Sequence, residues 1–130
     1  MVFYVQTDAA RVIRTALRAA PFMQGVRVVA ETLAQSVDSG VYVTVTGDGT
    51  PHGSRATSTE NVRINVYAKL EPDARDYARV IDGYLQDPRL NLGVKVTPGA
   101  NLIVVADLDT GGFVAAVTVL VASTKKGYNL

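Results

Sequence analysis

The stretch VRINVYAKLEPDARDYARVIDGYLQDP, residues 62–88, decides the fold because it places a patterned strand directly before a patterned helix. In its first part apolar and polar residues alternate, which predicts a β-strand with one buried face. In its second part Pro72 suits the first turn of a helix, and apolar residues then recur at three- and four-residue spacing. Asp87-Pro88 ends this pattern.

The same two patterns occur on both sides of this stretch. A helix is predicted over residues 8–20, with Thr7 or Asp8 as its cap and Pro21 at its end. Short β-branched or alternating runs predict strands at 26–30, 41–46, 94–97, 102–108 and 113–123, the last two forming a β-hairpin. The order predicts an α+β fold with two helices on one face of a mainly antiparallel or mixed sheet. We expect one domain over residues 1–123 and a flexible polar tail over 124–130.

The composition excludes several classes of protein and site. With no cysteine, the 130-residue chain has no disulfide, thiolate nucleophile or cysteine-based zinc site, and its single histidine excludes a histidine-rich metal site. A metal site built by one chain would need oxygen ligands only. Asp107 and Asp109 could hold a hard cation together, but no third ligand is evident near them, so we expect no metal and no cofactor. A net charge of +1 argues against a dedicated nucleic-acid binder. The N-terminal residues do not resemble a signal peptide, and the longest apolar run is about half the ~20 residues of a membrane helix, so we expect a cytoplasmic protein or a component of a particle assembled there.

The segment TGDGTPHGSRATSTE, residues 46–60, connects two predicted neighbouring strands. Its glycines do not have the spacing of a dinucleotide or phosphate loop, and such loops lead from a strand into a helix. No nucleophile and orienting acid are held in place beside its histidine, as a catalytic triad requires. We interpret the segment as a mobile arm that contacts a partner, with the candidate contact residues Asp48, Thr50, His52, Arg55, Thr57 and Glu60.

Two further surfaces are candidates for contacts. Arg11, Arg14 and Arg18 form a stripe along the first helix, which is either a solvated face or a surface for a negatively charged partner. The run from Phe113 to Ser123 is apolar on both faces, whereas a sheet covered on one side should alternate apolar with polar residues. Either another part of the chain or another copy covers its second face, which includes Val114 and Leu120.

The triplet Asp109-Thr110-Gly111 allows an alternative from another class. It resembles the catalytic triplet of aspartic proteases, of which the retroviral ones are homodimers of comparable length, so that the two carboxylates of the site would come from two chains. In that family, however, the triplet lies near the N-terminus, and here only 19 residues follow Gly111. A hairpin turn explains the same three residues. A soluble ligand-binding module, with a deep apolar pocket in the monomer, is a third alternative.

The pattern over nearly the whole chain resembles the tail terminator proteins of long-tailed phages of actinobacteria. The resemblance is carried by QTDAARV (6–12), NVYAK (65–69), AR (74–75), DGYLQDPRL (82–90), PG (98–99), LIV (102–104) and DTGGF (109–113). It implies a small domain with two helices against a sheet, and a structural role without chemistry. It also implies a long strand-to-strand loop that is mobile in the free subunit and ordered in the assembly; residues 46–60 match that loop in placement and composition.

The resemblance implies a definite place in the virion. Tail terminators form a homohexameric ring that caps the tail tube, stops its polymerisation and joins the tail to the head. The implied partners are other copies of the chain, the major tail tube protein and the head-neck connector or stopper protein, with DNA only passing through the lumen and no membrane. The protein would lie at the head-proximal end of the tail, and in the host cytoplasm during assembly. A neck or tail-completion protein of the same fold is the close alternative.

Overall fold

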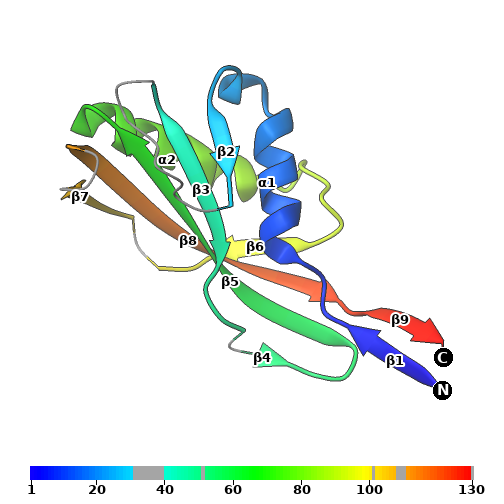
Figure 1. Ribbon diagram of the computed structural model, residues 1–130. Helices are drawn as coiled ribbons and strands as arrows, with labels where there is room; N and C mark the ends of the chain where they lie inside the picture. Colours follow the sequence, from blue (N-terminus) through cyan, green and yellow to red (C-terminus); the bar gives the residue numbers. More distant parts are fainter. Residues whose placement is uncertain (31–39, 51, 101, 108–110, 130) are drawn as a thin grey trace.

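In the computed structural model, residues 62–88 contribute to β5 (Thr57–Ala68) and α2 (Glu71–Leu85) (Figure 1). The structure describes residues 1–30, 40–50, 52–100, 102–107 and 111–129. The other elements in chain order are β1 (Val2–Val5), α1 (Ala9–Ala19), a short 3-10 helix (Pro21–Met23), β2 (Arg27–Val29), β3 (Tyr42–Gly47), β4 (His52–Gly53), β6 (Lys95–Pro98), β7 (Ile103–Asp107), β8 (Gly112–Thr124) and β9 (Lys126–Asn129).

The main sheet has the strand order β2-β3-β5-β8-β6, with β4 beside β5 and β7 beside β8. Among the described strands of this sheet, β2 and β3 pair in parallel and the other pairs are antiparallel. Strands β5 and β8 pair along their whole length, from Thr57 opposite Thr124 to Ala68 opposite Phe113. The predicted α+β class, with two helices and a mixed sheet, is confirmed.

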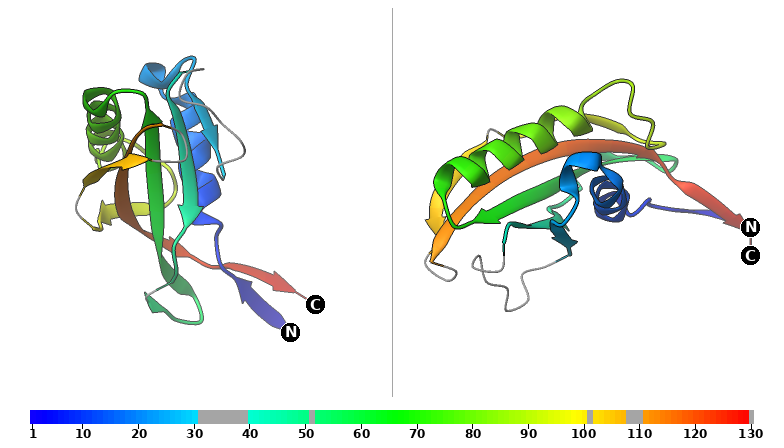
Figure 2. Two further views of the ribbon diagram at one scale, coloured as in Figure 1. Left: turned by 60° about the vertical axis from the view of Figure 1, so that its left-hand side comes forward. Right: turned by 90° about the horizontal axis from the view of Figure 1, so that it is seen from above.

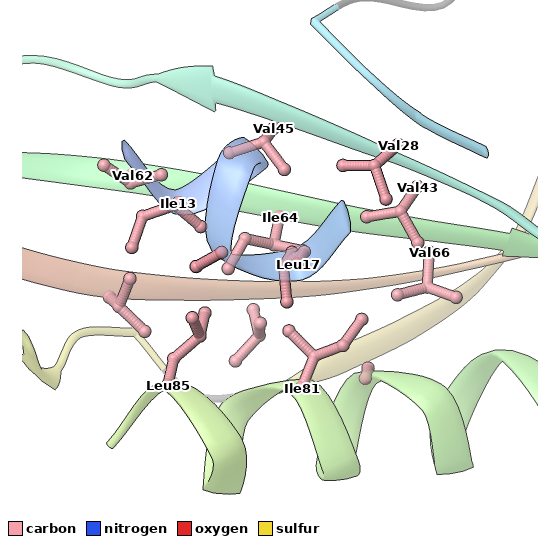
Figure 3. Close-up of a cluster of buried hydrophobic side chains, with 14 of the residues drawn as sticks. Ile13, Leu17, Val28, Val43, Val45, Val62, Ile64, Val66, Ile81 and Leu85 are labelled. Atoms are coloured by element: carbon pink, nitrogen blue, oxygen red, sulfur yellow. The ribbon is translucent and has the colours of Figure 1, made fainter. Parts of the chain in front are cut away.

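One face of this sheet carries the core. Across it, Ile64 of β5 lies opposite Val45 of β3 and Val117 of β8, and all three side chains are buried. The apolar faces of both helices pack into the same cluster, with Ile13 and Leu17 from α1 and Ile81 and Leu85 from α2 (Figure 3). Both helices therefore cover the same face of the sheet, because alternate residues of a strand point to opposite faces.

Local signals set the ends of the helices. The carboxylate of Asp8 caps α1 by accepting a hydrogen bond of 3.1 Å from the backbone N–H of Arg11. Beyond α2, the carboxylate of Asp87 accepts bonds from the backbone N–H of Arg89 (2.9 Å) and from its guanidinium (2.8 and 3.1 Å). These bonds lower the pKa of Asp87 to about 2. The turn that begins at Asp87 therefore holds its own ion pair at the surface.

Strands β4 and β9, and the first residues of β5, lie where the sequence predicts irregular chain. The expected long arm over residues 46–60 is wrong, because β3 extends to Gly47, β4 pairs with β5, and β5 begins at Thr57. Within the predicted flexible tail, residues 124–130, strand β9 instead pairs with β1 in an antiparallel ribbon. The physical reason is the same in both places. The side chains of these segments show no strand pattern, but strands elsewhere in the chain supply hydrogen-bond partners for their backbone N–H and C=O groups.

Candidate assembly surfaces

The face of the sheet opposite the helices is apolar around β7. Its strand register aligns Val105 of β7, Val114 of β8, Tyr67 of β5 and Tyr42 of β3 in one row across the sheet. The next row aligns Ile103 with Ala116. Ile103 is 58% exposed and Val105 51% exposed, whereas Val114 and Ala116 are half-buried. We call Ile103, Val105, Val114 and Ala116 the β7 patch.

The two candidate residues on β8 have different neighbours on this face. Val114 belongs to the β7 patch, between Tyr67 and Val105. Leu120 is half-buried six residues further along, between Asn61 of β5 and Thr97 of β6. The helices cover the other face of β8, where Ala115, Val117, Val119 and Val121 are buried. On the face away from the helices, the half-buried Val114 lies next to the exposed Val105.

Aromatic rings continue the apolar row beyond Val114. Tyr42 and Tyr67 stack with their ring centroids 4.7 Å apart, and the guanidinium of Arg27 lies 5.7 Å from the Tyr42 ring centroid. Burial raises the pKa of the Tyr42 hydroxyl, and the neighbouring Tyr67 and Asp107 raise it further, whereas Arg27 lowers it. This hydroxyl is buried and has no hydrogen-bond partner among the described residues. Tyr42 therefore stays neutral at physiological pH, and its fully buried side chain adds no exposed surface to this face.

A second exposed apolar surface is the ribbon of β1 and β9, which projects from the body of the protein (Figure 2). Val2, Phe3, Tyr4, Val5 and Tyr128 are each 41–43% exposed. The ring of Phe3 stacks on that of Tyr128 at 5.7 Å, and Lys126 lies 5.4 Å from the Tyr128 ring centroid. A two-stranded ribbon with this much exposed apolar surface is marginal in water unless it packs against something else.

The segment between β3 and β5 is tied to the base of this ribbon. The amide of Gln6 donates to Thr50 Oγ1 (3.1 Å) and to Glu60 Oε2 (3.2 Å). On the other side, the Lys125 side chain donates to the Ser54 carbonyl (2.6 Å), and Arg55 lies 5.1 Å from the Tyr4 ring centroid. Three of the predicted contact residues, Thr50, Arg55 and Glu60, are thus brought together around the ribbon.

The other candidate residues of this segment, Asp48, His52 and Thr57, make contacts within the segment or with β5. The backbone of Asp48 donates to Asn61 and that of His52 pairs with Thr59, while the Thr57 hydroxyl lies 2.8 Å from that of Ser54. These contacts fix the connection between β3 and β5 as a β-structure. They hold Thr50 and Arg55 in place against the ribbon.

The arginine stripe of α1 is divided between two roles. Arg14 donates to the Val45 carbonyl (2.9 Å), and Arg18 donates twice to the Val28 carbonyl (3.0 and 2.7 Å). Arg11 is exposed, and only its backbone N–H takes part in a described bond, to Asp8. Arg14 and Arg18 therefore attach α1 to β3 and β2, which the sequence alone does not predict.

We expect Arg18→Ala to lower the free energy of unfolding by about 1 kcal/mol, because it removes both bonds to the Val28 carbonyl. Arg11→Ala is the matched control on the same helix and should change stability by less than about 0.5 kcal/mol. Urea unfolding followed by circular dichroism measures both values. Equal effects of the two substitutions would contradict this division of the stripe.

The structure describes only some of the residues that could take part in chemistry. Asp109 lies outside them, so the aspartic protease alternative is not tested here. Within the described ranges, no three His, Cys, Asp or Glu side chains lie close enough to hold a metal ion, and no helix is long and apolar enough to cross a membrane. The described residues that line an open hollow between β5, β8 and β6 include Thr57, Ser58, Ser123 and Lys95.

The main site residues that sequence reasoning missed are Phe3, Val5, Tyr128, Ile103 and Val105. The sequence could have indicated Ile103 and Val105, because residues 102–105 form an apolar run as unbroken as that of residues 113–117.

In comparisons with known proteins, no family model and no curated protein matches this chain.

Proposed function

We propose that the protein is a structural subunit of a phage tail, which assembles as a homohexameric ring, caps the tail tube and ends its polymerisation. Support comes from the resemblance of residues 6–12, 65–69, 82–90 and 109–113 to tail terminators. The two helices on one face of a mixed sheet agree with the small domain of two helices against a sheet that the resemblance implies.

The observation that carries the proposal is the amount of apolar surface that the single chain leaves exposed. The ribbon exposes five large apolar side chains, and the β7 patch adds Ile103 and Val105. Soluble monomers rarely expose large contiguous apolar patches, and such patches mark sites of protein association. A protein that works by assembly accounts for both surfaces.

The proposed partners follow from this role. In the ring each copy contacts two others, and the two ring faces contact the major tail tube protein and the head-neck connector or stopper protein. DNA passes through the lumen without sequence-specific recognition, in keeping with a net charge of +1. The protein would then reside at the head-proximal end of the tail and do no chemistry.

The test combines a mass with a binding experiment. Light scattering and native mass spectrometry should give a particle of six 13.8-kDa chains, and negative-stain electron microscopy should show a ring. Mixed with purified tail tubes, the protein should bind at tube ends and stop further growth. A monomer that binds no tube at any concentration would overturn the proposal, while a ring that binds only the head-neck complex would favour a neck protein.

A further inference from the structure

One face of the ribbon is an aromatic surface with a single positive charge. The register pairs Phe3 with Tyr128 and Val5 with Lys126, so these four side chains lie on the same face. The opposite face carries Val2 and Tyr4, and there Arg55 of the hairpin already lies over the Tyr4 ring. We call Phe3, Val5, Tyr128 and Lys126 the ribbon face. It is the side of the ribbon that Arg55 leaves open.

The β7 patch is also apolar, and the charged residue beside it is negative. Ile103, Val105 and Asp107 alternate along β7 and point to the face away from the helices, since Val104 packs against the core. Asp107 is the one charged residue of β7, as Lys126 is of β1 and β9. Asp107 also interacts within its own chain. Its carboxylate still places a negative charge beside the patch.

These two surfaces lie at opposite ends of one molecule. Figures 1 and 2 show β7 at one end of the sheet, and β1 and β9 projecting beyond the other end, in every view. They therefore cannot contact each other within a single chain. When two different complementary patches lie on opposite ends of a subunit, contact between copies is head-to-tail, and such contacts generate rings when the rotation closes.

We propose that the ribbon face of one copy docks on the β7 patch of the next copy. Phe3, Val5 and Tyr128 cover Ile103, Val105 and Val114 of the neighbour, and Lys126 lies near its Asp107. Both surfaces lose exposed apolar area, and the charges are opposite at the contact. The inference rests on the proposed ring, because it names the contact from which the ring is built.

Cysteine crosslinking tests this contact directly, because the chain has no cysteine of its own. The double variant Val5→Cys/Val105→Cys, treated with a bismaleimide, should give a ladder of covalent multimers. The control Val5→Cys/Val80→Cys places its second thiol on α2, where Val80 is 49% exposed. It should give no ladder. If the uncrosslinked protein is a ring and the two variants crosslink alike, the ribbon contact is wrong although the proposed function stands.

A charge exchange gives an independent measurement. Lys126→Glu and Asp107→Lys should each weaken association about fivefold, because each brings like charges together, and the double variant should recover most of the loss. Lys95→Glu is the control at an exposed position on β6. Additive losses in the double variant would overturn the pairing of these charges. A wild-type protein that is monomeric at all concentrations would overturn both this contact and the proposed ring.

Discussion

A chain without residues 2–5 and 126–129 is expected to keep its fold and to lose its assembly. The ribbon contributes no side chain to the buried core, so its removal leaves the packing of the two helices on the sheet unchanged. It does remove Phe3, Val5 and Tyr128, whose exposed side chains are the aromatic and apolar anchors of the proposed ring. Buried aromatic anchors typically contribute about 2 kcal/mol or more each to an interface, or about 30-fold in Kd.

Light scattering and thermal unfolding together measure this outcome. A point variant, Phe3→Ser/Tyr128→Ser, should show the same loss without a deletion. Its matched control is Leu70→Ser/Val80→Ser, which removes two apolar side chains that are 59% and 49% exposed but lie outside the ribbon and the β7 patch. Rings that persist in the ribbon variants and dissociate in the control would place the subunit contact elsewhere.

The largest effect on stability is expected from Leu17→Ala. Leu17 is fully buried and points from α1 into the space between the two helices and the sheet (Figure 3). The truncation leaves a cavity at the point where both helices meet the strands, which should lower the free energy of unfolding by about 2–5 kcal/mol. Because a domain of this kind is stable by only about 5–15 kcal/mol, this is a large fraction of the total.

Urea unfolding measures this loss, with Leu70→Ala as the control. Leu70 is the same residue type and is 59% exposed at the start of α2, so its truncation should cost less than about 0.5 kcal/mol. The experiment is best done on the monomeric ribbon variant, because assembly adds its own stability to the native state. A Leu17→Ala value no larger than that of Leu70→Ala would mean that the two helices do not share one core.

The helices and the long strands follow from the sequence because they bury one face each. The alternation from Val62 to Ala68 and the helical spacing from Ala74 to Leu85 both survive in the structure as buried positions. Strands β7 and β8 pair antiparallel, as the predicted β-hairpin requires. In these segments local pattern and tertiary burial favour the same structure.

The segments that were predicted wrongly are held by partners far away in the sequence. The residues of β9, Lys126-Gly127-Tyr128-Asn129, have no alternating pattern, and they form a strand because β1 offers a free edge. The start of β5 is rich in Thr and Ser and pairs with the end of β8, as at Thr57 and Thr124. Strand formation depends on such context more than helix formation does, so local composition is a weak guide there.

The residues of the candidate surfaces could be named from the sequence only in part. The second apolar face of β8 indicated Val114, and the segment 46–60 indicated Thr50, Arg55 and Glu60, which the structure places around the ribbon base. Their role as contacts with a partner stays a prediction. The arginine stripe was a weaker guide, because the carbonyls that bind Arg14 and Arg18 belong to strands elsewhere in the chain. The ribbon face could not be predicted, since it exists only when both of its strands are paired.

The pairing of β1 with β9 also has a consequence for the order of folding. Val2 and Asn129 are separated by nearly the whole 130-residue chain, so closing this contact first would carry the largest loop entropy in the molecule. The local hairpin of β7 and β8 and the two helices involve far shorter loops and should form earlier. The ribbon is then completed last, after the core has closed. A chain that is still folding therefore lacks the ribbon face, which is one side of the proposed contact between copies. Association is then delayed until the core of the subunit has folded.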